Sequence, residues 1–277
     1  MWHKILNNIF VKNQFLVGFV LILALNGAEK NTVIIHSNTM DKDLPCIVIL
    51  PDNYTVSTDR FSVVYLLHGY GGNYQNWSEH KDLGKESDKY NLIIVCPDGG
   101  TNSWYLDSPI DLESQYRTYV GQEVVQYIDM YYKTIPDKHN RAITGLSMGG
   151  HGALYLALEF PDIFGAVGSM SGVVDLTYTT KKYELIEKIG SFEKYPERWE
   201  QYSVISNVEK FIGTGTKIIM DCGVDDVFIE SNRASHKKLL ELEISHDYSE
   251  KPGGHSWNYW VNILDYHLMA FQKFFQP

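Results

Sequence analysis

The sequence has few cysteines and no run of basic residues, and each shortage excludes a class of protein. Three cysteines in 277 residues are too few and too widely spaced for a disulfide scaffold. No CxxC pair or Cys/His cluster indicates a metal site. The formal net charge is −10, and Lys and Arg are scattered along the chain. A nucleic-acid partner is therefore not expected, because phosphate binding needs a basic face.

The three cysteines lie in or beside apolar runs. We therefore expect Cys46, Cys96 and Cys222 to be buried free thiols that behave as small hydrophobic residues. One disulfide among them stays open as an alternative if the protein resides in an oxidising compartment.

The longest apolar run, residues 15–25, is short. A membrane-spanning helix needs about 20 apolar residues, so an uncleaved anchor is the less favoured interpretation. Lys4 and Lys12 precede the run, and small residues around Ala28 follow it. This pattern predicts a signal peptide over residues 1–28 and a secreted or periplasmic mature protein.

The remaining chain, residues 29–277, alternates β-rich runs with helical patterns. This alternation predicts one α/β domain with a mostly parallel central sheet flanked by helices. The expected strands are 31–37, 44–51, 61–69, 90–100, 141–145, 164–172, 216–223 and 244–250, the first two as an antiparallel edge hairpin. The expected helices are 122–132, a helix directly after Ser147, 231–242 and 256–275. Residues 173–213 are polar and rich in Tyr, Lys and Glu, which predicts a small helical cap insertion lying over the sheet.

A GxSxG motif lies between one expected strand and the helix that follows it. It reads Gly145-Leu146-Ser147-Met148-Gly149. In this context the motif is typical of a nucleophile elbow, a tight turn that lifts a serine from a strand end onto a helix N-terminus. Glycine is needed on both sides because a Cβ there would collide with the neighbouring strand or helix. Ser147 is therefore the predicted nucleophile.

A serine hydroxyl is a weak nucleophile and needs a base, which in turn needs an acid to orient it. In α/β folds that carry a nucleophile elbow, the three residues occur along the chain in the order Ser, acid, His. The stretch "PGGHSWNYW" places His255 in a glycine loop after the last strand, and "DCGVDDVF" ends a strand with Asp225 and Asp226. We prefer Asp226 as the acid, with Asp225 next and Asp175, one strand earlier, as a third alternative.

Two backbone N–H groups are expected to stabilise the tetrahedral oxyanion. One belongs to Met148, the residue after the nucleophile, and the other comes from the loop "LLHGYGG", where we favour Tyr70. His68 in the same loop either contacts the substrate or braces the loop.

Aromatic residues are concentrated in the segments expected near the mouth of the site. Trp104 and Tyr105 are the best candidates for substrate contact, because their loop follows a strand whose C-terminal end should border the site. Trp257 follows His255 closely and is a further candidate. The flat faces of aromatic side chains suit contact with sugar rings or aryl acyl groups, although aromatic side chains more often fill a core.

Five stretches together carry a family resemblance. They are "LLHGYGG", "NSWYLDSP", "GLSMGGHGAL", "DCGVDDVF" and "GGHSWNYW". Across residues 31–275 the chain resembles the putative-esterase branch of the α/β-hydrolases, which includes esterase D, feruloyl and acetyl-xylan esterases, tributyrin-type esterases and mycolyltransferases. The resemblance implies a triad of Ser147, Asp226 and His255, with oxyanion donors at Tyr70 and Met148. Esterase D itself carries His where this chain has Leu146, so the secreted carbohydrate-associated and tributyrin-type esterases are closer.

The sequence thus predicts a secreted serine carboxylesterase that forms an acyl-enzyme and uses no cofactor or metal. The expected substrate is a small-molecule or carbohydrate-linked ester, with a feruloyl, acetyl or short-chain acyl group. An acyltransferase with the same triad is one alternative, and a non-catalytic binding protein on a hydrolase scaffold is another. The sequence does not fix the oligomeric state.

Overall fold

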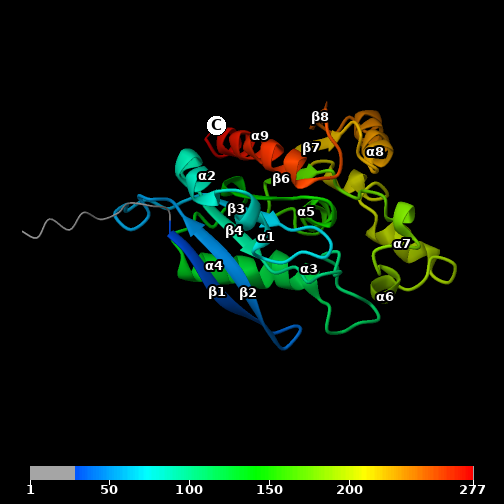
Figure 1. Cartoon of the computed structure of the whole chain (residues 1–277), viewed down its shortest axis with the longest axis horizontal. Helices are drawn as coiled ribbons and strands as arrows, with labels where there is room; N and C mark the ends of the chain where they lie inside the picture. The colour runs from blue at the N-terminus through cyan, green and yellow to red at the C-terminus, as the bar shows by residue number, and fades with distance from the viewer. Residues whose placement is uncertain (1–28, 277) are drawn as a thin grey trace, which may run out of the picture.

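A mixed eight-stranded sheet forms the centre of the molecule (Figure 1). The computed structural model describes residues 29–276, so the expected signal peptide at residues 1–28 lies outside the described part. The strand order is β1-β2-β4-β3-β5-β6-β7-β8. The strands are β1 (Glu29–Ser37), β2 (Lys42–Leu50), β3 (Val63–Leu67), β4 (Ile93–Pro97), β5 (Arg141–Gly145), β6 (Ala166–Met170), β7 (Lys217–Gly223) and β8 (Asp247–Lys251). Strand β2 pairs antiparallel with β1 and β4, and the other neighbours pair in parallel.

Helices cover both faces of this sheet, as the alternating pattern predicts. They are α1 (Asn76–His80), α2 (Leu83–Tyr90), α3 (Tyr116–Thr118), α4 (Val124–Tyr131), α5 (Met148–Glu159), α6 (Ile186–Ile189), α7 (Pro196–Tyr202), α8 (Ile229–Glu241) and α9 (Trp257–Phe275). Successive side chains of β3 enter different cores: Tyr65 packs with α4 and α5, whereas Leu66 packs with α2 and α9. Figure 1 shows α2 and α9 along one face and α4 along the other. The fold is that of an α/β protein with two buried layers.

Several elements differ from the sequence-based expectation. The pattern around α2 gave no helix prediction, because its buried face includes Glu86 and Ser87 as well as Leu83 and Tyr90. The helix expected at 122–132 starts earlier, as α3 followed by a π-helical turn, η1 (Tyr119–Glu123), before α4. Strand β3 is shorter than the expected 61–69, since the chain leaves the sheet after Leu67 to form the loop at the site.

The segment between β6 and β7 contains only short helices. Besides α6 and α7 it has the 3-10 turns η3 (Leu176–Thr179) and η4 (Val208–Phe211). Trp199 of α7 is fully buried, and its indole N–H donates to the Gly190 carbonyl at 3.1 Å. His151 of α5 lies 3.0 Å from the Tyr202 carbonyl through Nε2. The Trp199 bond lies within the segment, whereas the buried His151 contact ties the segment to α5.

Two further properties concern the whole described region. Cys46, Cys96 and Cys222 are buried and free, which confirms the expectation of unpaired thiols. Within residues 29–276, none of the helices combines the length and the apolar character that crossing a membrane would require.

Candidate active site

The expected elbow forms between β5 and α5. Ser147 adopts φ 53° and ψ −116°, a backbone conformation that side-chain-bearing residues rarely take and that stores strain. A Cβ on Gly145 would lie 2.6 Å from the backbone of Gly149, and one on Gly149 would lie 2.5 Å from the His68 carbonyl oxygen. Neither contact can be relieved by moving a flexible side chain. The glycines therefore allow the turn that presents Ser147, as the motif predicts.

Ser147, His255 and Asp226 meet in one line of hydrogen bonds. His255 Nε2 lies 2.8 Å from Ser147 Oγ, and His255 Nδ1 lies 2.8 Å from Asp226 Oδ2. The other carboxylate oxygen of Asp226 accepts the Phe228 backbone N–H at 2.9 Å. The Asp226 side chain is fully buried, whereas that of His255 is 25% exposed. Three side chains that are far apart in sequence thus lie where proton transfer from serine to histidine is geometrically direct.

Two neighbouring aromatic rings hold the His255 imidazole at its edges. Trp260 packs edge-on at a centroid distance of 4.8 Å and Phe228 at 5.2 Å.

The alternative acids lie away from His255: Asp225 is exposed, and Asp175 accepts the Thr177 backbone N–H at 2.9 Å. Of the three candidates, the structure brings only Asp226 to the histidine.

The expected oxyanion donors face no internal acceptor. In the part of the chain that the structure describes, the backbone N–H groups of Tyr70 and Met148 make no intramolecular hydrogen bond, although their neighbours Gly71 and Gly149 do. Met148 is the first residue of α5, so its N–H lies at the positive end of the helix dipole. Both groups are therefore available to an oxygen near Ser147.

His68 braces the loop that carries Tyr70. Its side chain is buried, Nε2 accepts the Gly99 N–H at 2.8 Å, and Nδ1 lies 2.9 Å from the Gly69 carbonyl oxygen. One neutral tautomer satisfies both contacts, with the proton on Nδ1, and burial lowers the pKa of this imidazole. The direct substrate contact suggested for His68 is not what the structure shows, because both ring nitrogens are used to hold the loop.

Trp104 and Tyr105 point to different places. Both have left-handed backbone conformations, with φ of 56° and 57°. Trp104 lines the pocket, as predicted, but Tyr105 is fully buried and donates its hydroxyl to the His68 carbonyl at 3.0 Å. Its ring occupies the space beside Gly152, where a Cβ would approach within 2.3 Å. The prediction that Tyr105 contacts substrate therefore needs correction, since its ring supports the loop from inside the core.

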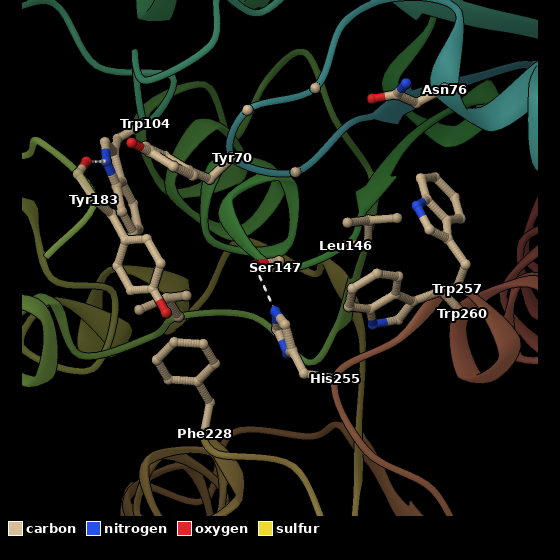
Figure 2. Close-up of a pocket in the computed structure, with 14 residues that line it drawn as sticks. Tyr70, Asn76, Trp104, Leu146, Ser147, Tyr183, Phe228, His255, Trp257 and Trp260 are labelled. Atoms are coloured by element: carbon tan, nitrogen blue, oxygen red, sulfur yellow. Dashed lines mark hydrogen bonds between the residues drawn. The ribbon is translucent and has the colours of Figure 1, made fainter.

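The pocket around Ser147 encloses about 330 Å³. In Figure 2, Tyr70, Trp104, Tyr183 and Phe228 lie on one side of Ser147, and Asn76, Leu146, Trp257 and Trp260 lie on the other. Trp257 lines the pocket as predicted. Sequence reasoning missed Asn76, Tyr183, Phe228 and Val173. Only Phe228 had a sequence signal, since it is the last residue of the stretch "DCGVDDVF" that contains the acid.

Tyr183 comes from the segment between β6 and β7. Its ring packs edge-on against Tyr70 at a centroid distance of 5.2 Å, and its carbonyl accepts the Trp104 indole N–H at 3.2 Å. The next residue, Glu184, accepts a hydrogen bond from the Asn102 side chain at 2.9 Å. These contacts hold one wall of the pocket in place.

A sheet of this order, with a serine elbow after β5 and a histidine after β8, defines an α/β-hydrolase. A family model described as "Putative esterase" matches residues 37–271, and the chain belongs to this esterase family. Membership makes the protein a serine hydrolase that acts on carboxylic esters.

Individual relatives agree with this assignment. An acetyl esterase of Caldicellulosiruptor saccharolyticus is 30% identical over 259 residues, which cover 83% of this chain and 92% of that protein. The solved structure of a ferulic acid esterase shares the fold with a TM-score of 0.77 and 24% identity, covering 89% of this chain and 99% of that one. A fluorophosphonate-binding serine hydrolase of Staphylococcus aureus has a TM-score of 0.78 and 19% identity, with 88% and 98% covered.

Proposed function

We propose that the protein cleaves its ester through an acyl-enzyme on Ser147, with His255 as the general base and Asp226 as the orienting acid. The observation that carries the proposal is the imidazole of His255, which lies 2.8 Å from both the serine oxygen and the aspartate oxygen. A binding protein would have no need for this alignment. The expected absence of a cofactor stays a prediction.

The geometry supports a two-step reaction. Ser147 Oγ attacks the ester carbonyl while His255 Nε2 takes its proton, and the resulting imidazolium is stabilised by Asp226. The oxyanion accepts hydrogen bonds from the backbone N–H groups of Met148 and Tyr70. Each bond stabilises the transition state by about 3 kcal/mol. The alcohol leaves with the proton from His255. Water then repeats the attack on the acyl-enzyme and releases the acid.

The pocket supports a small ester as substrate. Its volume of about 330 Å³ and its aromatic walls suit an acetyl, short-chain acyl or aryl acyl group. The relatives include a protein named acetyl esterase and one named endo-1,4-beta-xylanase/feruloyl esterase, which is 32% identical over 122 residues. We infer that the ester is carried by a small molecule or a carbohydrate.

The nucleophile can be tested with a fluorophosphonate probe and p-nitrophenyl acetate. Ser147→Ala should abolish labelling and lower the hydrolysis rate by about 10³-fold or more. The exposed Ser245→Ala serves as the matched control and should keep wild-type labelling and rate. Hydrolysis that survives in Ser147→Ala would falsify the assignment.

The substrate class can be tested by comparing acetylated xylan, methyl ferulate and tributyrin. The proposal expects release of free acid from at least one of them. Adding an alcohol acceptor separates hydrolysis from acyl transfer, since a transferase would form a new ester in preference to the free acid.

We further infer that the protein is exported, on the strength of the charge and hydropathy pattern of residues 1–28. N-terminal sequencing of the mature protein from a culture or periplasmic fraction should find cleavage near Ala28. An intact N-terminus on a cytoplasmic protein would contradict this inference.

A further inference from the structure

A second Thr-His-Asp hydrogen-bond chain lies in the core, beneath the proposed triad. Thr144 Oγ1 lies 2.7 Å from His267 Nδ1, and His267 Nε2 lies 2.6 Å from Asp221 Oδ2. All three side chains are buried, and His267 has no exposed surface. A carboxylate buried in this way needs a hydrogen-bonded partner, because desolvation penalises the charge.

This line of hydrogen bonds runs from β5 to β7 across the face of β6, the strand between them. A Cβ at Gly168 of β6 would lie 2.2 Å from His267 Nδ1 and 2.6 Å from Thr144 Oγ1. Any larger residue would therefore break the chain by occupying its path. His267 enters this gap from α9, which packs on the same face of the sheet.

Each member lies on an element that also positions one residue of the proposed triad. Thr144 of β5 is three residues before Ser147, and Asp221 of β7 is five residues before Asp226. His267 lies on α9, the helix that begins two residues after His255. The buried chain thus joins the three elements that must hold their spacing if Ser147, His255 and Asp226 are to stay aligned.

Backbone hydrogen bonds at the end of β6 link the buried Thr144–His267–Asp221 cluster to the proposed triad. The Ser147 N–H donates to the Met170 carbonyl at 2.9 Å, and the Ser171 N–H donates to the Asp221 carbonyl at 2.8 Å. Met170 and Asp221 are also paired across β6 and β7. A closed ring of contacts therefore runs from the nucleophile through β6 to Asp221 and returns through His267 and Thr144.

We propose that Thr144, His267 and Asp221 are positioning residues that fix the spacing of the strand ends bearing the nucleophile and the acid. This inference rests on the proposed triad. None of the three residues lines the substrate pocket, so their effect would pass through Ser147, Asp226 and His255. Small displacements of reacting groups are costly, since about 1 Å of misplacement can lower a rate by about 100-fold.

The sharpest test is Thr144→Val, which removes the hydroxyl and keeps the shape of the side chain. It should lower kcat for p-nitrophenyl acetate by about tenfold with KM unchanged, because binding contacts are intact but alignment is not. Thr144→Ser keeps the hydroxyl and should stay within about twofold of the wild-type kcat. Because His267→Asn leaves the Asp221 carboxylate without its partner and can prevent folding, the threonine pair carries the test.

The control for lost stability is Ile219→Ala, on the same strand and face as Asp221. It should lower the thermal midpoint at least as much as Thr144→Val but leave kcat within about twofold of wild type. Wild-type kcat in Thr144→Val, or an equal loss of kcat in Ile219→Ala, overturns the positioning role. Failure of the triad itself is separate, because it shows as activity that persists in Ser147→Ala.

Discussion

Adjacent residues in this chain have opposite environments, and the difference decides their chemistry. Asp225 and Asp226 follow β7 directly, yet Asp225 is exposed and Asp226 is buried with both carboxylate oxygens hydrogen-bonded. A buried carboxylate next to an imidazole stabilises the imidazolium that forms during catalysis, whereas a solvated one is screened.

The two aspartates therefore predict different mutant phenotypes. Asp226→Asn keeps the shape but removes the charge that orients His255, so kcat should fall by about 10³- to 10⁴-fold. Asp225→Asn should remain within about threefold of wild type, because its side chain faces water. Steady-state hydrolysis of p-nitrophenyl acetate measures both, and equal losses would contradict the choice of acid.

At the scale of elements, the segment between β6 and β7 completes the pocket. It supplies Tyr183, which packs on Tyr70 and lies on the same side of Ser147 as Phe228 (Figure 2). The wall depends on a few contacts with the loop that carries Trp104, so we expect the segment to influence which acyl groups fit.

Tyr183→Ala should widen the pocket and change its acyl selectivity. The ratio of kcat/KM for p-nitrophenyl hexanoate to that for the acetate should rise by about fivefold or more, since added methylene groups gain about 1 kcal/mol each where space allows. Tyr183→Phe retains the ring and should keep the wild-type ratio. An unchanged ratio in the alanine variant would mean that Tyr183 does not limit the acyl site.

His151 of α5 makes a buried contact with the same segment, and its titration should make the stability of the fold depend on pH. Burial lowers the pKa of His151 from 6.5 to about 4, so the folded protein keeps this imidazole neutral while the unfolded chain protonates it below pH 6.5. Stability should therefore fall as the pH drops from 6.5 towards 4, by roughly 3 kcal/mol from this group.

Urea unfolding of the wild type and His151→Gln at pH 7 and pH 4 tests this linkage. The variant cannot take up the proton, so its free energy of unfolding should decrease by roughly 3 kcal/mol less than that of the wild type between the two pH values. The same decrease in both proteins would show that His151 is not the titrating group.

At the scale of the whole molecule, stability comes from two apolar layers on the faces of one sheet, not from covalent links. Cys46, Cys96 and Cys222 all lie buried and free, and burial raises the pKa of Cys96 to about 12. Thiols that are buried and protonated react slowly.

A reductant should therefore leave the thermal midpoint of the protein unchanged. Titration with a thiol reagent should detect few reactive groups in the native protein and three after denaturation, since the sequence has three cysteines. A lower midpoint with reductant, or fewer than three thiols in the denatured protein, would indicate a disulfide.

Much of the fold follows from local patterns. The central strands β3 and β4 are continuous apolar runs, and the GxSxG motif between β5 and α5 marks the elbow. Helix α2 was not predicted, because the sequence pattern does not reveal that Glu86 and Ser87 are buried. The domain limits at residues 29–277 and the signal peptide stay predictions.

The candidate site divides in the same way. The sequence by itself determined the residue types and their order, since the elbow glycines, the serine, the paired aspartates and the histidine are local signals. Only the tertiary structure decided which aspartate meets His255, that His68 and Tyr105 turn into the core, and that Tyr183 closes the pocket. The physical reason is that these outcomes depend on contacts between residues distant in the chain, and such contacts are set by the packing of whole elements.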